Sequence, residues 1–151
     1  MADFVQDQIL AAIKTVLVQA GTDAASRVRV EGVDSLGPQS LPAIEIEAGD
    51  EEVQPVSQSK AGRTLQREFR VELRAIVSCA AGADYRSQCS HLHQQIERAL
   101  HSQTVHALDA VVPERLRLLG IRPGKDGDGA RVVYAMRSMW LVRYLAKEGT
   151  A

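Results

Sequence analysis

Apolar and polar residues alternate most regularly along residues 65–77, LQREFRVELRAIV. One parity of this segment is apolar except for Arg67, and the other is polar as far as Ile76. Alternation with a period of two is typical of a β-strand that has one buried face and one solvated face. We therefore expect the fold to be organised around this strand.

Two amphipathic segments predict helices. Residues 3–20 carry apolar side chains at helical spacing, and residues 84–102 carry a second apolar stripe that begins at Tyr85. Asp3 is a suitable N-cap for the first helix, and Gly21 can adopt the left-handed conformation that ends it. We expect both helices to cover the sheet.

Four further strands are predicted at residues 27–31, 43–47, 115–121 and 131–145, and turns are expected at Gly49-Asp50 and at residues 123–130. The last strand would measure about 50 Å at ~3.3 Å per residue, whereas a domain of this length is only ~40 Å across. Either this strand bends at a bulge or one end projects beyond the body. Both of its faces are partly apolar, which indicates a strand covered on both sides or a face used by another subunit.

Residues 50–64 are expected to form a long loop, because they are poor in hydrophobic residues and change from acidic to basic along their length. Loops of this length are usually functional or disordered, and the alternative here is a mobile hairpin tip without a role. The order of elements predicts a single α+β domain over residues 1–151. Its mostly antiparallel sheet would have about five strands, with two helices packed on one face.

Composition narrows the class of protein. The 151 residues are 45% hydrophobic and 25% charged, with a net charge of −1, so we expect no general attraction to nucleic acid or to an anionic membrane. Only two cysteines are present, which predicts reduced thiols rather than a disulfide framework. We expect no signal peptide and no membrane span, because the N-terminal segment lacks a basic region and apolar runs are short.

One candidate metal site lies on the second predicted helix. Cys89 and His93 are four residues apart on one face, and Glu97 follows one turn later. A site would need a further ligand such as His101 or His106. The alternative is a buried thiol beside surface histidines.

Two other patterns have ordinary explanations. Asp126-Gly-Asp128-Gly resembles a fragment of a calcium loop but lacks the later ligands, and Asp-Gly pairs commonly form turns. Arginines of neighbouring strands could form a positive strip, although interleaved glutamates favour a solvated face of ion pairs. The arginines concerned are Arg67, Arg70, Arg74, Arg115, Arg117 and Arg122. Motifs of serine hydrolases, phosphate-binding loops and zinc proteases are absent from the sequence.

The layout of the chain resembles the tail terminator (tail-completion, minor tail protein U-like) proteins of long-tailed bacteriophages. The matching features are the N-terminal helix, LPAIEIEAGDEE at residues 41–52, the long loop, REFRVELRAIV at 67–77, SHLHQQIERAL at 90–100, and a final hairpin that ends in LVRYL at 141–145. They cover nearly the whole chain. They consist of pattern and order rather than of an invariant motif.

This resemblance implies a structural subunit without an active site, metal or cofactor. Such subunits form a ring, usually a hexamer, that binds the last ring of the tail tube protein, stops polymerisation and provides the surface for the head-tail connector protein. It also implies a place in the virion tail after synthesis in the bacterial host cytoplasm. Under this interpretation the contacts with neighbouring rings include Glu51, Glu52, Lys60 and Arg63.

Three alternatives remain open from the sequence. One is a different ring component of a head-tail connector. Another is a small metal-dependent enzyme that uses Cys89 and His93. The third, a nucleic-acid-binding module, is disfavoured by the net charge and by the lack of an aromatic platform.

Overall fold

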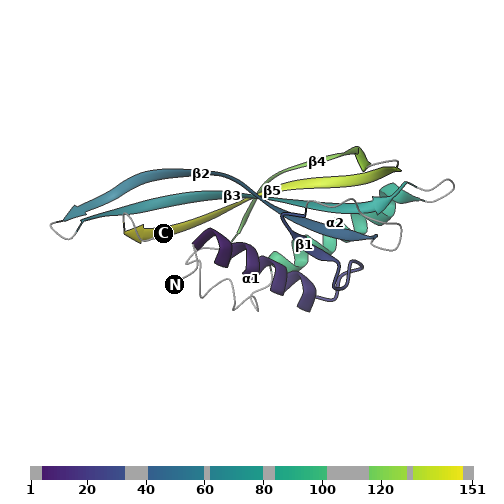
Figure 1. Ribbon diagram of the computed structural model, residues 1–151, viewed down its shortest axis with the longest axis horizontal. Helices are drawn as coiled ribbons and strands as arrows, with labels where there is room; N and C mark the ends of the chain where they lie inside the picture. The colour runs from purple at the N-terminus through teal and green to yellow at the C-terminus, as the bar shows by residue number, and fades with distance from the viewer. Residues whose placement is uncertain are drawn as a thin grey trace.

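The computed structural model describes residues 5–32, 41–59, 62–79, 84–101, 116–128 and 131–147. Its elements in chain order are α1 (Val5–Gln19), β1 (Val28–Val30), β2 (Ala43–Ser59), β3 (Gly62–Ser78), α2 (Tyr85–His101), β4 (Arg117–Asp128) and β5 (Arg131–Lys147). The strands form one sheet in the order β1-β2-β3-β5-β4, in which the β1–β2 pair is parallel and the other pairs are antiparallel. Both helices lie on the same face of this sheet (Figure 1). The predicted α+β class is confirmed.

The core lies between this face and the two helices. The apolar parity of β3 is buried as the alternation predicts, with Phe69, Val71 and Leu73 fully inaccessible. From β5, Trp140 is also fully buried, and it joins the helix residues in one cluster. Each large apolar side chain buried in this way stabilises the fold by about 1.5–3 kcal/mol. Gly21 ends α1 with a φ of 65°, the left-handed conformation expected for it.

The expected long loop at residues 50–64 is wrong. Most of it is a hairpin, because β2 continues to Ser59 and β3 begins at Gly62. The residues after the short AIEIE segment carry no alternation that would predict a strand, for two physical reasons. A bulge between Ala48 and Glu51 breaks the alternation. Beyond the bulge, most β2 side chains are exposed, so backbone pairing holds the strand without an apolar stripe.

We call the extended end of the sheet the arm: β2 residues 51–59, β3 residues 62–69 and β5 residues 142–147. It runs past the N-terminal end of α1, leaving part of the sheet uncovered by either helix (Figure 1). The β3–β5 pairing continues without a register shift from Ser78↔Val133 to Thr64↔Lys147. Of the two expectations for the last strand, projection beyond the body is therefore confirmed.

The turn expected at residues 123–130 is also shorter than predicted, because β4 extends to Asp128. Pro123 and Gly124 are tolerated there because β4 is at the edge of the sheet, where a missing N–H need not break the ladder. A bulge between Leu118 and Gly120 shifts the register of this strand.

Candidate functional site

The face of the sheet opposite the helices, which we call the open face, is strongly charged. One cross-strand row of it, the arginine row, takes one residue from each strand: Arg29, Glu45, Arg74, Arg137 and Arg122. Glu45 is only 4% exposed and accepts hydrogen bonds from Arg29 and, at 2.8 Å, from Nη1 of Arg74. The carboxylate thus neutralises one end of the row, while the β5–β4 end places two arginines directly opposite each other.

The face of ion pairs favoured by the sequence is present, since Arg70 pairs with Glu52 and Arg74 with Glu45, and the alternative positive strip is limited to Arg137 and Arg122. The strand order places β5 between β3 and β4, so Arg74 and Arg122 are connected through Arg137. Arg67 has the parity of the buried residues and belongs to the other face, while Arg115 lies outside the described residues.

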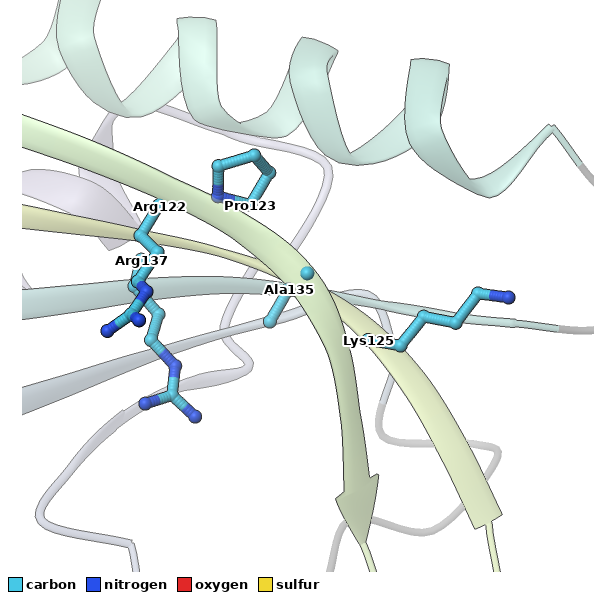
Figure 2. A pocket seen from close by; sticks show the side chains of 6 residues that line it. Arg122, Pro123, Lys125, Ala135 and Arg137 are labelled. Atoms are coloured by element: carbon cyan, nitrogen blue, oxygen red, sulfur yellow. The ribbon is translucent and has the colours of Figure 1, made fainter.

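A shallow pocket of about 190 Å³ lies at the β4–β5 end of this row. Its lining residues are Arg122, Pro123, Gly124, Lys125, Ala135 and Arg137. Figure 2 shows the side chains of Arg122 and Arg137 pointing in the same direction, away from the helix, whereas the ring of Pro123 points toward it. Lys125 directs its ammonium over the ring of Tyr85 on α2, 5.7 Å from the ring centroid, so the basic groups on the open face here are Arg122 and Arg137, which suit a carboxylate or another small anion.

Carboxylates gather on the β2–β3 part of the open face. Glu47 lies opposite Glu72. Partial burial raises the pKa of Glu47, and the charge of Glu72 raises it further, while Arg74 acts in the opposite direction. Farther along, Glu52 accepts a hydrogen bond from Nη1 of Arg70 at 3.2 Å.

At the base of the arm, on the face covered by the helices, three polar side chains form a partly buried cluster. Oε1 of Glu51 accepts a hydrogen bond from the Tyr144 hydroxyl at 2.5 Å, and its Oε2 accepts one from Nη1 of Arg67 at 2.9 Å. The side chains of Glu51 and Arg67 are only 10% and 15% exposed. Burial raises the pKa of Tyr144, and the bond to the Glu51 carboxylate raises it further, so the phenol stays protonated. The cluster fastens β2 to β3 and β5.

The four charges expected to contact a partner do not form one group. Glu51 and Glu52 are successive strand residues and therefore point to opposite faces, the first into the cluster at the base of the arm. Arg63 lies near the tip of the hairpin and is partly buried. Lys60 lies outside the described residues.

The residues considered for metal binding have other environments. The Cys89 thiol is fully buried and donates a hydrogen bond to the carbonyl oxygen of Ala75 at 3.2 Å, and burial raises its pKa to about 11. Burial lowers the pKa of His93, although Glu97, with its Oε2 3.7 Å from Nε2 of the histidine, acts against this shift. The part of the chain that the structure describes contains no group of three potential metal ligands. His106 and the side chains of Asp126 and Asp128 lie outside it.

Sequence reasoning missed the pairing of Arg122 with Arg137 and the inclusion of Tyr144 in the arm cluster. Neither has a local signal, because both depend on which strands are neighbours. Among the described helices, none is long and apolar enough to cross a membrane.

Comparison with known proteins gives matches among solved structures alone. No family model matches the chain, and no curated protein matches it. Among solved structures, a chain from the "virion of native gene transfer agent (GTA) particle" is similar, with 17% sequence identity and a TM-score of 0.46. The match covers 96% of this chain and 100% of that chain. Neither the identity nor the TM-score is high enough to assign a function to this protein.

Proposed function

We propose that this chain is a structural subunit of a phage-like virion that assembles into a closed ring at the end of a tail tube. The ring ends polymerisation of the tube protein and provides the surface to which the head-tail connector binds. The observation that carries the proposal is the arm, because a sheet that extends beyond its covering helices offers uncovered surface to other subunits (Figure 1).

The shape of the sheet supports this function. In the described residues β1 pairs with β2 at Ile44–Ile46, and the Glu31 carboxylate accepts a hydrogen bond from the amide of Ala48, so β2 is an open sheet edge from Gly49 onward. Strand β4 provides the other edge. Exposed edges and exposed apolar residues on them, such as Val53, Val56 and Ile121, are liabilities for a monomer unless another chain covers them. A ring subunit would have such a partner on each side.

Within the arm, we assign contacts with neighbouring rings to Lys60 and Arg63. Arg63 is the second residue of β3, next to the tip of the hairpin, and Lys60 lies outside the described residues. Glu51 acts differently, since its carboxylate holds the arm through Arg67 and Tyr144. We expect this residue to position the tip.

A catalytic function has less support. The thiol of Cys89 is buried and bonded to a backbone carbonyl, which leaves it unsuited to the metal-dependent chemistry considered from the sequence. A different ring of the head-tail connector would use the same features. It is distinguished by its binding partner, because a tail terminator binds the growing end of the tube.

The first test is the molar mass of the purified protein by light scattering over a range of concentrations, alone and with preformed tail tubes. We expect a species near six times the 16.4 kDa of one chain, or its assembly on tube ends. The second test replaces Lys60 and Arg63 with alanine and retains Glu51 and Glu52. Loss of tube-length control with normal folding supports the proposal, whereas unchanged length control contradicts the assigned contacts.

A further inference from the structure

The two open edges of the sheet carry opposite charges. β2 contains five acidic residues and no basic one: Glu45, Glu47, Asp50, Glu51 and Glu52. Along residues 117–125 of β4 the charged residues are Arg117, Arg122 and Lys125, all basic. Since these strands lie on opposite sides of the β3–β5 pair, the charge separation runs across the sheet. Glu45 and Glu51 are largely buried and bonded to arginines of the same copy, and Lys125 lies over Tyr85. The acidic edge therefore consists of Glu47, Asp50 and Glu52, and the basic edge of Arg117 and Arg122.

The spacing of the charges on the two edges also matches. On the open face, Glu47 and Glu52 lie opposite Glu72 and Glu68, which are four residues apart on β3. Arg122 and Arg117 lie opposite Arg137 and Leu141, which are likewise four residues apart on β5. Each pair contains one bulge between its members, so each spans four positions of its neighbouring strand. That distance is roughly 13 Å in both cases at about 3.3 Å per residue.

We infer that neighbouring copies in the ring join edge to edge, with Arg122 of one copy against Glu47 of the next and Arg117 against Glu52. This inference rests on the proposed ring and names its subunit interface. Because β2 and β4 are antiparallel in the sheet, a rotation about a ring axis brings them together as an antiparallel pair. Within one copy, the cross-strand rows of Arg122 and Arg117 each lie two residues along β5 from the rows of Glu47 and Glu52. A shift of two residues along the strand between neighbouring copies therefore aligns both charge pairs.

The interface places opposite charges beside two like-charged cross-strand pairs of each copy. Arg122 and Arg137 face one another across β4 and β5, and Glu47 faces Glu72 across β2 and β3. Like charges that lie directly opposite in a sheet are destabilising. The pocket beside Arg122 and Arg137 would receive the carboxylate of Glu47, whose pKa is already raised by burial and by neighbouring carboxylates.

Apolar side chains flank the charges on both edges. Val53 and Val56 are 46% and 57% exposed on β2, and Leu119 and Ile121 are each 46% exposed on β4. Leu119 and Ile121 lie between Arg117 and Arg122 and would be covered by the contact, whereas Val53 and Val56 follow Glu52 and lie beyond the paired segment. A second copy is favoured over nucleic acid, because nucleic acid would be repelled by the acidic edge and the chain has a net charge of −1.

A pair of charge-reversal variants tests the interface. The first carries Arg117→Glu and Arg122→Glu, and the second carries Glu47→Lys and Glu52→Lys. Each variant alone has two edges of like charge, so we expect its self-association to weaken at least about a hundredfold. An equimolar mixture should recover assembly, because a head-to-tail ring can alternate the two variants. Far-UV circular dichroism of each variant checks folding, and Arg86→Glu with Arg98→Glu on the exposed side of α2 is the matched control.

The outcomes separate this inference from the proposed function. Assembly of the wild type together with undiminished assembly of each reversal variant overturns the edge interface and leaves the ring intact. A wild type that assembles neither alone nor on tail tubes overturns both. A mixture that stops at a one-to-one dimer overturns the head-to-tail arrangement, because a ring must continue from subunit to subunit. Recovery of the wild-type mass by the mixture supports the inference.

Discussion

Replacement of Glu51 with alanine should destabilise the protein far more than the same change at the next residue. Glu51 and Glu52 are adjacent on β2, and each accepts a hydrogen bond from an arginine of β3. They differ in burial, because the side chain of Glu51 is 10% exposed and that of Glu52 is 57% exposed. The comparison therefore sets a largely buried carboxylate, which also binds Tyr144, against an exposed one.

The expected magnitude follows from the contacts. Glu51→Ala removes the bonds to Arg67 and Tyr144, and a hydrogen bond to a charged group contributes about 1.5–3 kcal/mol. It also leaves a largely buried guanidinium without this partner, and breaking a buried pair costs about 3–5 kcal/mol. Since Arg67 retains 15% exposure, we expect a loss of about 3 kcal/mol. Glu52→Ala breaks only a surface pair and should cost less than about 1 kcal/mol.

Urea unfolding at one fixed protein concentration measures both free energies of unfolding. A Tyr144→Phe variant should show an intermediate loss, about 1 kcal/mol, because only one hydrogen bond is removed. Hydrogen exchange should show faster opening of arm amides in Glu51→Ala than in the wild type. Equal losses for Glu51→Ala and Glu52→Ala would refute the role assigned to the cluster at the base of the arm.

Three further effects follow from local geometry. Burial lowers the pKa of His93 in the folded state. Its contribution to stability is therefore complete above the pKa of the unfolded state and is lost as the pH falls. In urea titrations from pH 7.5 to 5, the free energy of unfolding should depend less on pH for His93→Gln than for the exposed control His91→Gln. A Cβ at Gly49 would lie 2.9 Å from a backbone carbonyl oxygen of β3, so Gly49→Ala should lower the unfolding midpoint, unlike Gly124→Ala, where no atom lies within 4 Å. Because burial raises the pKa of Cys89 to about 11, mass spectrometry at pH 8 should find this thiol unmodified by iodoacetamide in the native protein, and modification at the rate of an unfolded control would contradict that environment.

Much of the fold was predictable because burial leaves a periodic pattern. The alternation of residues 65–77 identified β3, and two apolar stripes with a glycine stop identified α1 and α2 to within a few residues. The length of the last strand already required it to bend or to project. All of these signals arise where a side chain faces the core.

The arm and the charged face were decided by tertiary structure. Residues 50–59 have no apolar alternation, and they form a strand because their backbone pairs with β3 while neither helix covers them. Glu51 and Glu52 point to opposite faces because strand side chains alternate, and the bulge between Ala48 and Glu51 decides that Glu51 is the one on the face covered by the helices. The order β3-β5-β4, which places Arg137 between Arg74 and Arg122, leaves no local mark in the sequence. Sequence periodicity reports what each segment buries, whereas the neighbours of a strand depend on long-range pairing that only the folded chain establishes.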